Sequence, residues 1–241
     1  MISPIISIDK TKYLIIHTAQ RSVAIEGSLE VNGSSIEYVP SFTFLGVSID
    51  NHINWKAHIE QVRKRIAPKV GIISQLRHFV PKSTLLLLYN SLILPHISYC
   101  LEIWGHTNSS FLNPILLLQK KIVRLITFSD YRAHSAPLFK QLGILDINNL
   151  CTLHTCTFIF DLINNKFAHG IHHYLEPLPH DYETRQSTNT NFYIPKVKLT
   201  LSKHNLKYAA TKQWNALPTC IKSIHSMYLF KTKLKEYLHQ L

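Results

Sequence analysis

The spacing of hydrophobic residues changes near residue 50, and this change predicts two kinds of structure. Before that point short β-prone runs dominate, and residues 41–49 are predicted to form one strand with Gly46 inside it. A glycine within a strand marks a bulge or a close approach of another backbone or a ligand. Beyond residue 50 the apolar residues recur at helical spacing. The pattern therefore predicts an α+β fold that is mainly α.

The first predicted helix follows Asn54, whose side chain can cap it. Its apolar stripe recurs at steps of three and four and consists of Trp55, Ile59, Val62, Ile66, Val70 and Ile73. Pro68 removes one backbone hydrogen bond and clashes with the preceding turn, so we expect a kink or a break over 64–67. The basic residues of this helix lie off the stripe and are Lys56, Arg63, Lys64 and Arg65.

Turn and cap signals place the remaining elements. The Asn32-Gly33 pair predicts a hairpin over 28–39, and β-prone runs predict strands over 11–18 and 196–202. Two further helices are expected in the middle of the chain, one after Pro81 with Ser83 as its cap and one from Pro95 to Gly105. Three more are expected over 110–128, over 136–142 with Gly143 ending it, and from the cap Asp146 to 165. The last two are expected over 203–216 and 226–240. The helix over 110–128 has an outer face that carries Lys120, Lys121 and Arg124.

Short motifs in a fixed order carry a family resemblance. They are Phe44-Leu-Gly-Val47, Trp55 with His58-Ile59, Leu92 to Cys100, Ile103-Trp-Gly105, Leu118 to Ile126, His134 to Leu142, Tyr182-Glu-Thr-Arg185, Trp214-Asn-Ala-Leu-Pro218 and Phe230-Lys231. In this order, and over almost the whole chain, they resemble the reverse transcriptases of LINE-type (non-LTR) retrotransposons.

This resemblance implies functional parts. Phe44, Leu45 and Gly46 would correspond to the primer grip, and the helix after them would open the thumb. The implied domains are the end of the palm (1–50), a helical thumb-like domain (51–165), a polar linker with a strand (166–205) and C-terminal helices (206–241). Asp9 to Lys12 resembles the segment that follows the catalytic Tyr-x-Asp-Asp turn, so that turn would lie before Met1. The resemblance therefore implies a truncated product of an RNA-directed DNA polymerase.

The charge distribution points to an anionic partner. The chain has a formal net charge of +12. Residues 51–140 carry twelve Lys and Arg against three Asp and Glu, whereas residues 1–50 carry three against five. The positive field thus begins with the thumb-like helix, which favours RNA, DNA or an RNA–DNA hybrid as the partner. The alternative is that the basic residues only keep the protein in solution.

The acidic residues do not suggest a catalytic centre. Two-metal polymerisation needs clustered carboxylates, and the sequence contains no adjacent pair of acids. We therefore expect this chain to lack catalytic residues and its own cofactor, while the resemblance implies Mg²⁺ for the parent enzyme. Cys151, His154 and Cys156 are zinc-ligand types, but their spacing is not that of a finger or knuckle, so a core or surface role is favoured.

Cysteine and aromatic residues complete the sequence picture. The four cysteines have no disulfide-framework spacing and no signal peptide is seen, so we expect an intracellular setting, nuclear or cytoplasmic. Polar residues interrupt the apolar run over 85–104, which argues against a membrane span. Core positions are expected for Tyr89, Tyr99, Trp104 and Trp214. Tyr131, next to Arg132, is the best candidate for base stacking, although a structural role is favoured.

Two functional hypotheses follow. The first is a reverse transcriptase fragment that binds template and primer without reading sequence and does not itself polymerise. The second is a helical protein-interaction module without nucleic-acid function. The salt dependence of binding separates them, because release of counterions from phosphates produces a slope that a protein-interaction module would not show.

Overall fold

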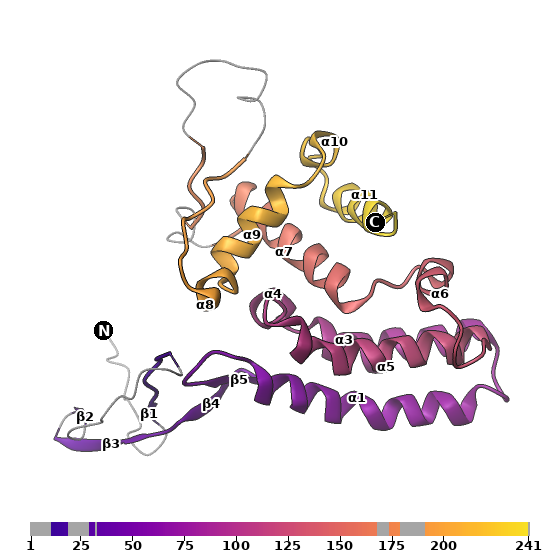
Figure 1. The fold of residues 1–241 in the computed structure, drawn as a ribbon, viewed down its shortest axis with the longest axis horizontal. Coiled ribbons are helices and arrows are strands. Elements are labelled where there is room, and N and C mark those ends of the chain that lie inside the picture. Colours follow the sequence, from indigo (N-terminus) through magenta and orange to yellow (C-terminus); the bar gives the residue numbers. More distant parts are fainter. Residues whose placement is uncertain (1–10, 19–28, 32, 168–173, 179–190, 241) are drawn as a thin grey trace, which may run out of the picture. The chain divides into compact units, whose positions relative to one another are not determined.

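The chain is mainly α-helical with a few short strands (Figure 1). The computed structural model describes residues 11–18, 29–31, 33–167, 174–178 and 191–240. Residue contacts group the chain into two compact units, 1–61 and 62–241, and the division falls within helix α1. The sequence-based division into four functional parts stays a prediction.

The first unit contains the strands, which form two small sheets. They are β1 (Lys12–Tyr13), β2 (Leu29–Val31), β3 (Ser34–Tyr38), β4 (Ser41–Phe44) and β5 (Val47–Asp50). In one sheet β3 pairs in parallel with β1 and antiparallel with β2, with Val31 opposite Ser34, so the predicted hairpin is confirmed. The strand predicted over 11–18 is wrong beyond Tyr13, because only Lys12 and Tyr13 find partners on β3.

Helix α1 (Lys56–Leu76) runs unbroken through Pro68, so a break over 64–67 is wrong, while a kink there stays a prediction. All six residues of the predicted stripe are buried, and Ile66 and Ile73 are fully inaccessible to solvent. A proline inside a helix costs about 3 kcal/mol. Burying one aliphatic side chain contributes about 1.5–3 kcal/mol, so burial of the stripe exceeds this cost. Just before the helix Asn54 Oδ1 accepts a hydrogen bond of 2.9 Å from the amide of Lys56, the first helical residue, so Asn54 lies one residue before the cap position, which Trp55 occupies.

The apolar run over 85–104 folds as several short helical pieces. They are α2 (Lys82–Leu88), a π-helical turn (Tyr89–Ile93), α3 (Leu94–Ser98) and α4 (Leu101–Trp104). The single helix predicted from Pro95 to Gly105 is therefore wrong, because Cys100 adopts a φ of +52° and breaks it. Tyr99, beside this break, is 50% exposed instead of buried. Ser83 lies inside α2 and is not its cap. Within the described residues no helix has the length and apolar character needed to cross a membrane.

Three predicted helices are confirmed nearly to the residue. They are α5 (Ser109–Thr127), α6 (Ser135–Leu142) and α7 (Ile147–Ile163). Gly143 ends α6 with a φ of +62°, and Asp146 caps α7 by accepting a hydrogen bond of 2.9 Å from the Asn149 amide. Gln119 of α5 is fully buried, and its amide donates to the Tyr89 hydroxyl at 3.1 Å. Burial raises the pKa of Tyr89 to about 12, although the bond to Gln119 opposes the rise.

The C-terminal part contains two short helices, α8 and α10, in addition to the two that were predicted. Its elements are α8 (Thr200–Lys203), α9 (Leu206–Asn215), α10 (Thr219–Lys222) and α11 (Met227–Leu238). The strand predicted over 196–202 is wrong, because α8 begins inside that range. Phe230 of α11 stacks on Phe160 of α7 with ring centroids 4.5 Å apart, and Trp214 of α9 lies 5.9 Å from Phe230. This aromatic cluster joins α7, α9 and α11 in one core.

Candidate nucleic-acid interface

The primer-grip-like residues lie at a hairpin turn and not within one strand. Strands β4 and β5 pair antiparallel, with Phe44 opposite Val47, so Leu45 and Gly46 form a two-residue turn. Leu45 has a φ of +46° and Gly46 a φ of +82°, the combination that a type I′ turn requires. The prediction of a single strand with an internal glycine is therefore wrong. The turn leaves Phe44 58% and Leu45 74% exposed.

Hydrogen bonds hold this hairpin against the first turns of α1. The Ser48 amide donates to His58 Nδ1 at 3.3 Å, and the Ser48 hydroxyl donates to Gln61 Oε1 at 3.1 Å. Ser48 and His58 are both buried. Thr43 on the facing strand places its hydroxyl 3.0 Å from that of Ser48. The apolar turn is thus presented on a rigid support, which is the arrangement that a contact with another molecule needs.

Replacing Gly46 by valine is expected to destabilise the hairpin by about 1–2 kcal/mol, because a β-branched residue at positive φ clashes with its own backbone. Thermal unfolding of the purified chain measures the change. Gly46→Asn is the matched control, since asparagine tolerates this conformation, and it should unfold close to the wild type. Equal stability of the Val and Asn variants would contradict the assignment of Gly46 as a turn glycine.

The basic residues of α1 differ in their surroundings. Lys56, in the first unit, is exposed, and so are Lys64 and Arg65 in the second. No described carboxylate forms an ion pair with Lys64 or Arg65. Arg63 is half-buried and already has an interaction partner. Lys64 and Arg65 are therefore the members of the predicted set best placed to meet an external anion.

Lys69 extends this basic surface and was missed by the sequence analysis. It lies one helical turn after Arg65, and its ammonium donates to Nε2 of His96 on α3. Partial burial, followed by the charges of Lys69 and Arg65, lowers the pKa of His96. His96 is therefore the neutral member of the cluster at pH 7. The spacing of four between Arg65 and Lys69 was the sequence signal for this surface.

The basic face predicted on α5 is only partly open to solvent. Lys121 is exposed, whereas Lys120 and Arg124 are half-buried. Arg124 Nε donates to the Ala133 carbonyl at 2.8 Å, and Nη1 donates to the Lys120 carbonyl at 3.3 Å. Part of the guanidinium therefore holds the chain after α5 in place. Its role in nucleic-acid binding stays a prediction, as do those of Lys120 and Lys121.

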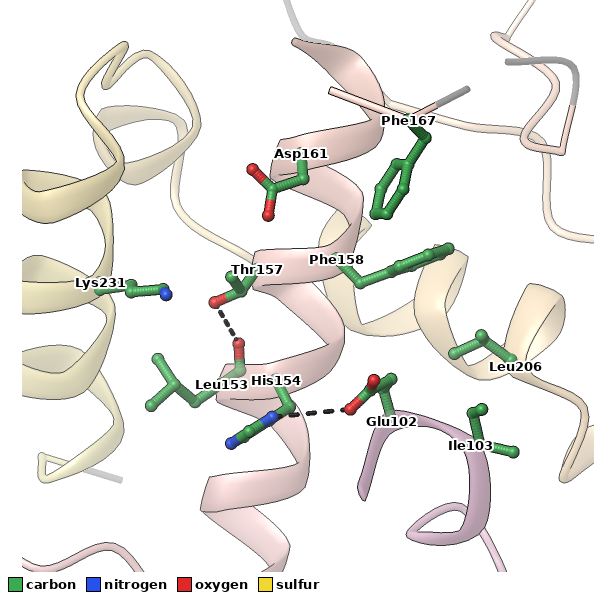
Figure 2. Close-up of a pocket in the computed structure, with 10 residues that line it drawn as sticks. All are labelled: Glu102, Ile103, Leu153, His154, Thr157, Phe158, Asp161, Phe167, Leu206 and Lys231. Atoms are coloured by element: carbon green, nitrogen blue, oxygen red, sulfur yellow. Dashed lines mark hydrogen bonds and ion pairs between the residues drawn. The ribbon is translucent and has the colours of Figure 1, made fainter. Parts of the chain in front are cut away.

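A second region of interest is a pocket of about 370 Å³ among α4, α7, α9 and α11, shown in Figure 2. His154 Nδ1 lies 3.5 Å from the Glu102 carboxylate, and Asp161 forms an ion pair of 2.9 Å with Lys166. Partial burial opposes ionisation of Glu102, but hydrogen bonding to His154 and the backbone, with the charges of His154 and His106, lowers its pKa overall. The pocket wall holds two carboxylates against the single ammonium of Lys231, so its charge does not favour a phosphate.

The described aspartates serve local structure. Asp50 Oδ1 accepts from the His52 amide at 2.8 Å, Asp130 accepts from the Arg132 amide at 2.8 Å, and Asp146 caps α7. Asp9 and Asp181 lie outside the described residues. Among the residues that are described, no three His, Cys, Asp or Glu side chains gather as a metal site would require. The described carboxylates thus do not fit the two-Mg²⁺ centre implied for the parent enzyme.

Cys151 and Cys156 have the properties of packing residues. Both are buried in α7, and burial raises the pKa of Cys151 to about 12 and also raises the pKa of Cys156. A zinc ligand must be a thiolate, which this burial disfavours. His154, between them in the sequence, faces Glu102 instead (Figure 2). Of the core or surface roles that the sequence favoured, these surroundings fit a core role for both cysteines.

Comparison with known proteins finds similarity to RNA-directed DNA polymerases of mobile elements. The chain is 26% identical over 121 residues to the RNA-directed DNA polymerase from mobile element jockey of Drosophila melanogaster, a stretch that covers 48% of this chain. It is 27% identical over 108 residues to the probable RNA-directed DNA polymerase from transposon X-element, and 24% over 137 residues to that from transposon BS, both of the same organism. No family model matches, and no solved structure matches significantly.

These likenesses support the resemblance to LINE-type (non-LTR) retrotransposon reverse transcriptases that the motif order indicated, over about half of this chain. The matched stretches span 13%, 12% and 15% of the length of these three relatives. The matches cover about half of this chain, whereas the motifs run through most of it.

Proposed function

We propose that this chain binds RNA duplex or RNA–DNA hybrid through the exposed cations of α1, without reading sequence. The proposal rests mainly on one observation: Lys64 and Arg65 are exposed and form no ion pair within the described part of the chain. Lys69 adds a third cation on the same helix. The similarity to RNA-directed DNA polymerases supports nucleic acid as the source of the complementary charge.

The geometry of an A-like duplex suits such a surface. Its major groove is too deep and narrow for side chains to read, so a protein follows the phosphates and 2′-hydroxyls. A helix with cations on successive turns places positive charge at intervals of about 5.4 Å, which can follow a line of phosphates. Arginine contributes a planar fork that binds phosphate oxygens in pairs, and lysine contributes a point charge.

The direct test is a titration of purified protein against a blunt RNA–DNA hybrid at several salt concentrations. We expect the logarithm of the association constant to fall linearly with the logarithm of the salt concentration, by about 0.9 for each phosphate contacted. Hybrids of unrelated sequence should bind with similar affinity, because phosphates carry no sequence information. An association constant that does not change with salt would contradict the proposal.

We further propose that the 241-residue chain contributes binding and not catalysis to the parent reaction, the copying of RNA into DNA. Mg²⁺ would supply the chemistry there by stabilising the attacking and leaving oxygens, and its ligands are clustered carboxylates. Here the described aspartates are separately engaged in caps, turns and an ion pair.

Purified chain should therefore incorporate no nucleotide on a primed RNA template with either Mg²⁺ or Mn²⁺. Primer extension followed on a sequencing gel measures this, with a known reverse transcriptase as the positive control. Incorporation that co-purifies with the chain and disappears on chelation would contradict the proposed division between binding and catalysis.

The second candidate function is a protein-interaction module. Exposed apolar side chains favour it, chiefly Phe79 after α1, which is 83% exposed, and Leu87 on α2, which is 65% exposed. Exposed apolar residues that gather in a patch mark protein interaction sites. This function predicts hybrid binding that is absent or insensitive to salt, so the same titration decides between the two.

A further inference from the structure

A small basic cleft lies at the end of α5 and includes two cations of its basic face, Lys121 and Arg124. It has a volume of about 240 Å³ and is lined by Arg77, Lys121, Arg124, Leu125, Ser129 and Tyr131. Arg77 directly follows α1, and Lys121, Arg124 and Leu125 belong to α5. Ser129 and Tyr131 lie in the loop between α5 and α6. All of these residues belong to the unit 62–241. Three cations therefore line the same cleft, two of them on α5 and one directly after α1.

The two arginines of the cleft are held in position. The Arg77 guanidinium lies over the Phe128 ring, 5.2 Å from its centroid, and its Nε is buried without a hydrogen-bond acceptor in the described structure. Arg124 is fixed through Nε and Nη1 by backbone carbonyls, and its Nη2 has no acceptor among the described groups. A buried donor without an acceptor is destabilising, so an anion that accepted a hydrogen bond from Arg77 would bind more tightly for it.

No described carboxylate neutralises the cleft. None of the ion pairs formed by described residues includes Arg77, Lys121 or Arg124. The nearby acid in the sequence, Asp130, is exposed and accepts a hydrogen bond from the Arg132 amide. The cleft therefore keeps a net positive charge that would attract a compact anion.

An exposed aromatic ring, that of Tyr131, lies at the edge of the basic cleft. Tyr131 is 72% exposed, and Arg132 lies over its ring at 5.1 Å and donates from Nε to its hydroxyl at 2.5 Å. Because the Tyr131 ring is mostly exposed, packing does not fix its orientation, and the contacts with Arg132 restrain it instead. Aromatic rings held in the open beside basic residues are the surfaces on which proteins stack single-stranded bases.

We infer that the cleft binds one phosphate of a single-stranded nucleic acid while the adjoining base stacks on Tyr131. The size supports a phosphate, since pockets for whole drug-sized ligands usually measure roughly 300–1,000 Å³ and this one is smaller. The strand is single because a base inside a duplex is stacked on its neighbours and cannot reach the ring. This inference rests on the proposed nucleic-acid binding and adds a second site with a different substrate.

The test uses the full chain and a short single-stranded RNA that carries one 2-aminopurine, whose fluorescence falls when the base stacks. Tyr131→Leu should restore much of the fluorescence and weaken binding about fivefold or more, which corresponds to about 1 kcal/mol for one lost stacking contact. Binding to the blunt hybrid should stay unchanged. Tyr228→Leu is the matched control, because Tyr228 on α11 is 77% exposed and lies outside the cleft.

A charge variant tests the phosphate contact separately. Lys121→Met should lower the salt slope for the single strand by up to about 0.7, the value for one phosphate, whereas Lys140→Met, at an exposed position on α6, should leave it unchanged. If Tyr131→Leu behaves like Tyr228→Leu and Lys121→Met behaves like Lys140→Met, the inference that the cleft binds a nucleotide is wrong. That result would leave the hybrid's salt slope intact, whereas a flat slope for wild-type protein on the hybrid would overturn the proposed function itself.

Discussion

Replacing Lys64 and Arg65 together by alanine should lower the salt slope of RNA–DNA hybrid binding by up to about 2. Each phosphate contact contributes about 0.9 to that slope on a duplex, and both residues are exposed without a described ion-pair partner. Hybrids of different sequence should weaken to the same extent, because the lost contacts are to phosphates. Filter binding across a series of salt concentrations measures the slope directly.

The matched control for this variant is Lys231→Ala with Lys235→Ala. Both of these lysines are exposed on α11, so the control removes the same charge from a different helix. An equal loss of slope in the two double variants would mean that only net charge matters. An unchanged slope in the Lys64 and Arg65 variant, with helix content intact by circular dichroism, would remove α1 from the binding surface and favour the interaction module.

Replacing Phe230 by alanine should lower the free energy of unfolding by about 3–5 kcal/mol. Phe230 is fully buried, stacks on Phe160 at 4.5 Å and lies 5.9 Å from Trp214, so its removal leaves a cavity where α7, α9 and α11 meet. Domains of this kind have a total stability of about 5–15 kcal/mol, so the loss is a large fraction. Urea denaturation followed by tryptophan fluorescence reports the change.

Tyr228→Ala provides the control, because Tyr228 occupies the same helix but is 77% exposed. It should change stability by no more than about 0.5 kcal/mol. A similar loss in both variants would indicate that α11 itself is easily disrupted, and a small loss for Phe230→Ala would contradict a shared aromatic core. The comparison also tests whether the C-terminal helices form part of the folded second unit.

Local patterns in the sequence determined much of the helical structure. The apolar stripe of α1 is buried at every predicted position, from Trp55 to Ile73. The helix ends at Gly143 and Asp146 also lie where the sequence placed them. These features depend on residues within a few positions of one another, through helical periodicity, capping hydrogen bonds and the conformational freedom of glycine. The order of motifs was likewise enough to indicate the LINE-type reverse transcriptase region.

Contacts between residues that are distant in the sequence, or burial in the folded chain, explain the predictions that were wrong. Leu45 and Gly46 form a turn because β5 folds back on β4, a choice that β-propensity over 41–49 does not reveal. Pro68 stays within a continuous helix because burial of the surrounding stripe exceeds the cost of its missing hydrogen bond.

The candidate sites show the same division. The sequence identified the exposed cations Lys64, Arg65 and Lys121 from their position off the apolar stripes. Only the tertiary structure showed that Arg124 is tied to the Ala133 carbonyl and that Arg77 converges with Lys121 and Tyr131 on one cleft. Periodicity determines which side of a helix faces outward, whereas a pocket depends on how separate helices and loops pack together.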